Sequence, residues 1–189
     1  MPLDKKTWMS IFISAIMILS VIGFALTFTE PEHQVEYNGI KFSKTQQGWQ
    51  AKIKGVKMQF FYHPAEVEDI PFDKGAGVAL DGPRVVWFSY NPNDLYSAEI
   101  ADVMYYMEDS LGKWANVYVQ RALTDNADYQ LPQITCANAT MEVPVIIIES
   151  GNETVVEHRD GCIIASADNA RDIYRLGDRL IYQELKVMK

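Results

Sequence analysis

Residues 85–94 read VVWFSYNPND, and this stretch marks the passage from a strand to a helix. Its first six residues are a continuous apolar run, which is typical of a strand covered on both faces. The polar end, 91–94, stops the strand and offers helix N-caps. Apolar residues then recur on one helical side, at Ile100, Val103, Met104, Met107, Leu111 and Trp114. With a second strand over 116–123, the pattern predicts a β-α-β unit with parallel strands and a right-handed crossover.

The chain beyond this unit predicts two further strands and a helix. Residues 143–148 are an apolar run that opens on Pro144, and we expect a hairpin around Gly151 to return along 154–165, with a bulge at 160–161. Asp168 or Asn169 is expected to cap a final helix. Its apolar side is formed by Ile173, Leu176, Leu180 and Ile181. The helix also carries Arg171, Asp172, Arg175, Asp178 and Arg179. The Arg175/Arg179 pair is expected on a solvated, salt-bridged face rather than at an anion site.

The chain before the unit predicts an antiparallel meander. Asn38-Gly39 is the strongest short hairpin signal, and Lys54-Gly55 separates two stretches of period-two alternation. Residues 64–84 carry three prolines and three glycines and read as an irregular connector. The predicted fold class is α+β: an N-terminal transmembrane helix, a β-meander (30–63), the connector (64–84) and an α/β core (85–189) around one mixed sheet.

The transmembrane helix is predicted from Thr7 to Thr29, 23 residues without a charge. At 1.5 Å per residue such a helix is about 34 Å long, enough to cross the hydrocarbon core of a bilayer. Lys5 and Lys6 precede it and acidic residues follow it, so the positive-inside rule predicts residues 1–6 in the cytoplasm and 30–189 outside. The alternative is a signal peptide cleaved after Ala25, at a small-x-small site.

The exported part is acidic and contains both cysteines. Residues 30–189 carry a formal charge of −9, from 15 basic and 24 acidic residues, which argues against nucleic acid as a partner. Cys136 and Cys162 lack metal-ligand spacing, so on an oxidising face a disulfide is the leading interpretation. The alternative is that both are small buried apolar residues. Asn138 and Asn152 begin Asn-x-Thr sequons and are candidate N-glycosylation sites.

The sequence carries none of the common catalytic, phosphate-binding or metal-binding motifs. It therefore predicts no catalytic residue, no metal site and no cofactor. Clustered acids such as Glu66, Glu68 and Asp69 read as solvated side chains.

The order β-α-β, then β-β-α, with Val143-Pro144 opening the third core strand, resembles the thioredoxin-like fold over residues 85–187. The resemblance implies that Pro144 occupies the place of the cis-proline and that residues 93–96 occupy the place of the redox motif. No cysteine stands there, so the redox chemistry of that fold is not implied. The overall layout also resembles uncharacterised, N-terminally anchored proteins of archaea, which supply no activity.

Three functions follow as hypotheses. The first is a membrane-anchored, non-enzymatic domain that binds or organises an unknown partner protein of the envelope. The second is a thioredoxin-like redox or disulfide-handling protein that uses Cys136 and Cys162. The third is a hydrolase that uses scattered carboxylates.

Overall fold

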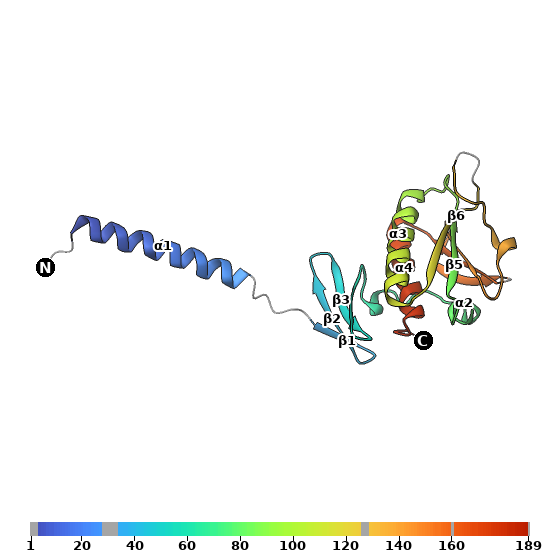
Figure 1. Ribbon diagram of the computed structural model, residues 1–189, viewed down its shortest axis with the longest axis horizontal. Coiled ribbons are helices and arrows are strands. Elements are labelled where there is room, and N and C mark those ends of the chain that lie inside the picture. Colours follow the sequence, from blue (N-terminus) through green and yellow to red (C-terminus); the bar gives the residue numbers. More distant parts are fainter. Residues whose placement is uncertain (1–3, 28–33, 126–128, 160, 189) are drawn as a thin grey trace. The chain divides into compact units, whose positions relative to one another are not determined.

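The computed structural model describes residues 4–27, 34–125, 129–159 and 161–188. The chain divides into two units, Met1–His33 and Gln34–Lys189, and each is described by itself. In the described part of the first unit, helix α1 spans Lys5–Thr27 (Figure 1). Its Lys5–Gly23 part is long and apolar enough to cross a membrane, and none of it is buried in the protein. The predicted helix is confirmed as far as Thr27, while residues 28–29 lie outside the described residues.

The second unit begins with an antiparallel sheet in the strand order β1-β2-β3-β4. The strands are β1 (Gln34–Tyr37), β2 (Ile40–Thr45), β3 (Gly48–Ile53) and β4 (Val56–Phe60). Asn38 and Gly39 join β1 to β2 with φ values of 48° and 78°, and Lys54 and Gly55 join β3 to β4 with 50° and 86°. Two successive positive φ values make the tight turn whose twist matches the flanking strands. The predicted meander is confirmed.

The connector contains two helical elements that the sequence prediction missed, η1 (Pro64–Glu66) and α2 (Lys74–Leu80). Asp73 caps α2 by accepting a hydrogen bond from the backbone N–H of Gly75. A Cβ at Gly75 would lie 2.7 Å from Nδ1 of His158, so the glycine allows a close approach to the strand that carries His158. Glycines lower helix propensity. For this reason the sequence favoured an irregular segment, and that prediction is wrong for α2.

The rest of the unit is built on a five-stranded mixed sheet in the order β6-β5-β7-β9-β8. Its strands are β5 (Val85–Tyr90), β6 (Tyr118–Leu123), β7 (Val145–Ser150), β8 (Val155–Arg159) and β9 (Cys162–Ala167). Strand β5 pairs in parallel with β6 and with β7, and β7 pairs in parallel with β9. Only β8 runs antiparallel to its neighbour, β9. The predicted β-α-β unit and mixed sheet are confirmed.

The predicted hairpin between 143–148 and 154–165 is wrong. Residues 154–165 form two strands, and the hairpin is the one between β8 and β9, closed by the pair Arg159 and Cys162 next to Gly161 with φ of 80°. Burial explains the order. Residues 145–148 of β7 are buried in succession, which suits an interior position, whereas β8 carries Glu157, His158 and Arg159 and suits the edge.

Helices α3 (Ser97–Trp114) and α4 (Ala170–Glu184) pack side by side and contribute to the main core (Figure 1). The apolar side predicted for each helix is confirmed, except that Trp114 is only half-buried. Asn169 caps α4, as expected, by accepting a hydrogen bond from the backbone N–H of Asp172. The solvated face predicted for Arg175 and Arg179 is wrong in part, because Arg179 is buried, whereas Arg175 forms salt bridges as expected. Asp172 and Asp178 of the same helix are buried as well.

The sheet has a second, smaller apolar cluster apart from the main core. It consists of Val145, Ile147 and Cys162, with Trp87, Ile134, Cys136, Ala139 and Ile164 packed against them. Ile134, Cys136 and Ala139 belong to residues 129–144, here called the covering segment. This segment contains a short helix, η2 (Cys136–Asn138), and runs from the end of β6 towards the start of β7.

Candidate functional site

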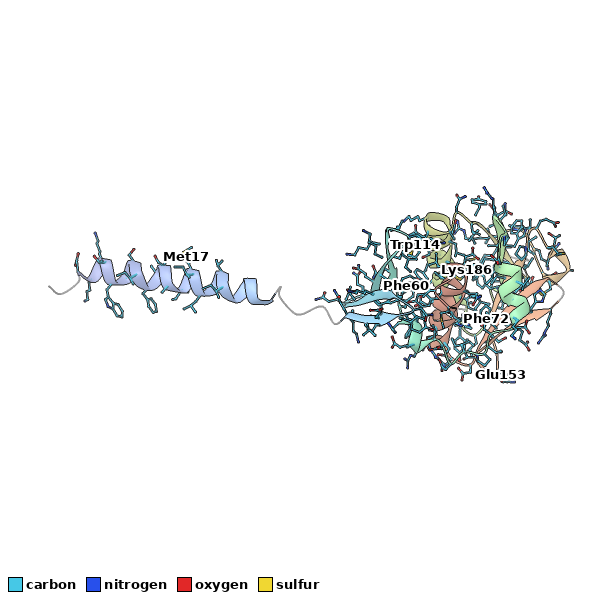
Figure 2. The ribbon with its side chains drawn as sticks, turned by 90° about the horizontal axis from the view of Figure 1, so that it is seen from below. Met17, Phe60, Phe72, Trp114, Glu153 and Lys186 are labelled. Atoms are coloured by element: carbon cyan, nitrogen blue, oxygen red, sulfur yellow. A yellow bond between two sulfur atoms is a disulfide. The ribbon has the colours of Figure 1, made fainter. Side chains whose placement is uncertain are left out.

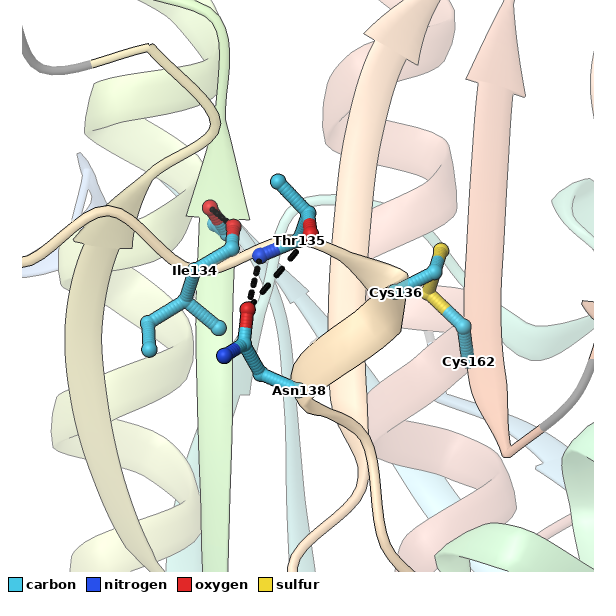
Figure 3. The surroundings of a disulfide bond; sticks show 6 residues. Ile134, Thr135, Cys136, Asn138 and Cys162 are labelled. Carbon is cyan, nitrogen blue, oxygen red and sulfur yellow. Dashed lines mark hydrogen bonds between the residues drawn. A yellow bond between two sulfur atoms is a disulfide. The ribbon is translucent and has the colours of Figure 1, made fainter.

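The covering segment is fixed to the sheet by a disulfide. Cys136, at the start of η2, is bonded to Cys162, the first residue of β9, with the two Cα atoms 5.1 Å apart (Figure 3). The predicted pairing is therefore present in the structure. Cys162 is fully buried and lies opposite Val145 of β7, whereas Cys136 is half-buried. The bond thus joins the segment to the interior of the sheet and not to the open end of a hairpin.

Hydrogen bonds hold the same segment beside the disulfide. The Ser89 hydroxyl donates to the carbonyl of Ile134 at 2.7 Å, and the Ile134 N–H donates to the carbonyl of Leu123 at 2.9 Å. Within η2, Oδ1 of Asn138 accepts from the backbone N–H of Thr135 at 2.9 Å (Figure 3). Ser89 is a buried polar residue of β5, so this bond also satisfies a hydroxyl that would otherwise be stranded in the sheet.

The other predicted site residues lie apart from one another. Asn138 and Asn152 are both exposed, the first in η2 and the second in the turn between β7 and β8. The cis-proline expected at Pro144 is contradicted, since no peptide bond among the described residues is cis. Pro144 instead continues the extended backbone into β7, and its carbonyl accepts a hydrogen bond from the Trp87 N–H at 3.0 Å.

A buried polar cluster that sequence analysis missed lies between the two sheets. Its centre is Asp178 of α4, which is fully buried. One carboxyl oxygen, Oδ2, accepts from the backbone N–H of Tyr62 at 2.7 Å, and Oδ1 lies 2.6 Å from the Tyr106 hydroxyl. The Tyr182 hydroxyl donates to the carbonyl of Tyr62 at 2.6 Å. The cluster therefore ties the end of the meander to both helices.

The environment of the cluster disfavours a charge. Burial raises the pKa of the Asp178 carboxyl to about 7, although hydrogen bonds from Tyr106 and from the Tyr62 and Phe61 backbone act in the opposite direction. Burial and the neighbouring Asp178 likewise raise the pKa of Tyr106 well above its ordinary value. A carboxyl that gains or loses its proton near neutral pH is a feature that functional sites share with some structural networks.

The cluster borders a cleft of about 410 Å³ between β4 and α3. Tyr106 lies in its wall, half-buried as a residue, with its hydroxyl directed inward to Asp178. The lining is mainly aromatic and amide side chains, with Phe60 and Trp114 5.9 Å apart between ring centres (Figure 2). Its remaining members are Gln47, Gln50, Lys57, Met58, Gln59, Phe61, Asp109 and Ser110. The volume of this cleft lies within the range of ligand clefts, and its aromatic side chains are of the kind that line them.

A second buried group, His63, was also missed. Its side chain is surrounded by the rings of Tyr37, Phe42 and Trp49 at centroid distances of 6.0, 5.0 and 4.7 Å. Nδ1 accepts the N–H of Ala65 at 3.3 Å, while the buried Nε2 has no hydrogen-bond partner among the residues that the structure describes. Burial lowers the pKa of this imidazole. The only cue in the sequence is the His63-Pro64 pair, which marks a chain reversal but not a buried ring.

The described residues include no group of three or more His, Cys, Asp or Glu side chains that could hold a metal ion. Glu66, Glu68 and Asp69 are exposed, as the sequence predicted. Glu66 also accepts hydrogen bonds from Trp49 Nε1 at 3.0 Å and from the His63 N–H at 2.8 Å. Asp69 pairs with Arg175. These acids serve the fold around η1.

Comparisons of the chain with protein-family models, with curated proteins and with solved structures found no match. The class of the protein is therefore defined by its own structure: an α+β domain with a four-stranded antiparallel sheet and a five-stranded mixed sheet, preceded in the chain by an apolar helix. The resemblance to the thioredoxin-like fold stays a prediction.

Proposed function

We propose that the protein is a single-pass membrane protein that holds residues 30–189 outside the cytoplasm, where this domain binds another protein of the cell envelope without catalysis of its own. The observation that carries the proposal is the presence, in one chain, of an exposed apolar helix and a disulfide-bonded domain.

The helix supports the anchor because it is long and apolar and its side chains are exposed. Trp8, Met17 and Leu19 are 66%, 66% and 69% exposed, and Figure 2 shows Met17 projecting from the helix. Transfer of such side chains from water to lipid is worth about 1.5–3 kcal/mol each. The basic residues at the N-terminal end, Lys5 and Lys6, favour a cytoplasmic N-terminus. A signal sequence would have the same length and composition, which leaves cleavage after Ala25 as the alternative.

The disulfide supports export, because such bonds persist in oxidising compartments and are rare in the cytoplasm. The orientation also exposes Asn138 and Asn152 to a glycosylation machinery where the host has one. Binding rather than catalysis is supported by the use of the clustered acids as structural ligands, and by the aromatic cleft between β4 and α3.

Membrane topology is tested with sealed, right-side-out vesicles that contain the full chain. Protease added outside is expected to degrade residues 30–189 and to leave a tag placed before Met1 intact until detergent is added. A domain that stays protected until detergent is added would overturn the proposed orientation. The mass of the mature chain distinguishes a retained anchor from a product that starts at Leu26.

Partner binding is tested by in-cell photocrosslinking from a position in the cleft and from a matched position outside it. We choose Gln50 in the cleft lining and the exposed Lys74 of α2 as the control. A discrete adduct from Gln50 that is absent from Lys74 is expected. A chain that stays monomeric from both positions would contradict binding through the cleft.

A redox function is the second candidate, favoured by one observation: Cys136 is only half-buried, so one of the two bonded cysteines is partly open to solvent. Thiol titration of the native full chain without reductant separates the two functions. Two free, fast-reacting thiols would support disulfide exchange, whereas an inert bridge would support the binding domain.

A further inference from the structure

The Asp178 carboxyl joins three parts of the domain that are distant in sequence. It stands on α4, accepts the backbone N–H of Tyr62 just after β4, and contacts the Tyr106 hydroxyl of α3 at 2.6 Å. It is fully buried. We propose that Asp178 and Tyr106 form a proton-dependent latch between the β1–β4 sheet and helices α3 and α4, closed when Asp178 is protonated and loosened when it is ionised.

The two hydrogen bonds of the Tyr106 hydroxyl need one more proton than is present when Asp178 is ionised. The Tyr106 hydroxyl lies 2.6 Å from Oδ1 of Asp178 and 3.1 Å from the backbone carbonyl of Gln59 in β4. A tyrosine hydroxyl has one proton to donate, while a carboxylate and a carbonyl only accept. With Asp178 protonated, the acid donates to Tyr106 and Tyr106 donates to Gln59. With Asp178 ionised, Tyr106 donates to the carboxylate and the bond between α3 and β4 is lost.

In the described part of the chain, the groups that face Asp178 provide no positive charge. From α3 they are Tyr106 with Ser110 beside it, from α4 Tyr182, and from η1 Glu66, whose negative charge opposes ionisation further. Among the described residues, no salt bridge includes Asp178. Arg175, one turn away, is paired with Asp69 and Asp172. An ionised Asp178 would therefore be a buried charge with hydrogen bonds from Tyr106 and from the Tyr62 and Phe61 backbone but without an opposite charge, and burial still outweighs those bonds.

These facts place the protonation of Asp178 within the range of ordinary solution pH, in agreement with a pKa raised to about 7. The bond that ionisation breaks lies at the cleft, since Tyr106, Gln59 and Phe61 all line it. Rising pH is thus expected to release the edge strand β4 from α3 and to widen the cleft. The latch is a property of the fold and does not depend on the proposed membrane location.

Hydrogen exchange of the full chain in detergent micelles tests the latch at about pH 5.5 and about pH 8, corrected for the intrinsic pH dependence of exchange. The Asp178 carboxyl has a pKa of about 7 in the closed state and about 4, the ordinary value, in the open state. Each pH unit between these two pKa values shifts the opening equilibrium tenfold, so the change from about pH 5.5 to about pH 8 shifts it about thirtyfold. Peptides covering 56–62 are therefore expected to exchange about thirtyfold faster at the higher pH.

The variant Asp178→Asn resembles the protonated acid, because its amide can donate to Tyr106. Its exchange over 56–62 is expected to be independent of pH and close to that of the wild type at low pH. Asp172→Asn is the matched control. Asp172 is also buried on α4, but it is paired with Arg175 at 2.9 Å and its pKa is lowered, so this variant should keep the wild-type pH dependence.

Two further measurements keep the test decisive if Asp178→Asn fails to fold. Tyr106→Phe removes the hydroxyl and should give fast exchange of β4 at both pH values. Infrared spectroscopy of the wild type should show a buried protonated carboxyl that disappears as pH rises through neutrality. Equal corrected exchange at the two pH values in the wild type would overturn the proposal, as would pH-dependent exchange that persists in Asp178→Asn.

Discussion

Removal of the disulfide by the double substitution Cys136→Ala/Cys162→Ala is expected to lower the free energy of unfolding by about 3.5 kcal/mol. The two cysteines are separated by 26 residues. In the chain-entropy treatment, opening a loop of about this length returns about 12 cal/mol/K to the unfolded chain, or about 3.5 kcal/mol at 25 °C. Alanine is chosen because Cys162 is fully buried, and a serine hydroxyl there would lack a partner.

Urea unfolding of the full chain in detergent, followed by tryptophan fluorescence and circular dichroism, measures the change. Trp87 packs against the small cluster under the covering segment, so its emission should also report loosening of that segment before global unfolding. Wild-type protein treated with reductant is the control, because it keeps both side chains and removes only the cross-link. Equal unfolding midpoints for oxidised wild type, reduced wild type and the variant would refute the reasoning.

Three further predictions concern single residues. Gly177→Ala places a Cβ 2.7 Å from Cγ1 of Val103 in the α3–α4 contact, so we expect a net loss of about 1–2 kcal/mol after the gain in helix propensity, measured by urea unfolding. His63 has a lowered pKa in the fold, so the unfolded chain takes up its proton first and the contribution of His63 to stability should fall as pH drops below about 6.5, while the raised pKa of Asp178 acts in the opposite direction. His63→Asn keeps an acceptor for the cap and should make the variant gain stability relative to the wild type as pH falls below about 6.5; a pH-independent difference between the two would contradict the assignment. In a glycosylating host, Asn152→Gln should remove one glycan from the exported chain, and Asn138→Gln another, each seen as a mass difference; a mass unaffected by either substitution would argue against export.

Local signals in the sequence were sufficient for much of the fold. Asn38-Gly39 and Lys54-Gly55 specify their turns because both positions need positive φ, and the structure has it at all four residues. The apolar spacing on α3 and α4 identified the buried sides of both helices. Such features depend on neighbours within one turn of the chain, so a single sequence contains them.

The same local signals could not predict the strand order or the burial of polar residues. From the sequence alone, residues 154–165 fit next to β7 either as one strand or as two. Burial decides between the two arrangements, because β9 takes the interior position of the sheet beside β7. In the sequence, Asp178 is one of several charged residues of α4. Its hydrogen-bond partners, Tyr62 and Tyr106, are 116 and 72 residues away in the chain. A pattern of polar and apolar residues does not show which hydrogen-bond donors, distant in sequence, will lie next to a carboxyl in the fold.

The placement of β9 between β7 and β8 has a consequence for the route by which the chain matures. The β8–β9 hairpin involves only near neighbours in sequence, so it can form early, whereas its docking on β7 closes a longer loop. Because Cys162 lies opposite Val145, docking of the hairpin on β7 places its sulfur at the position where it bonds to Cys136 in the fold. We therefore expect oxidation to seal an already assembled sheet rather than to direct its assembly, which would let the newly made chain acquire its topology before meeting any oxidant.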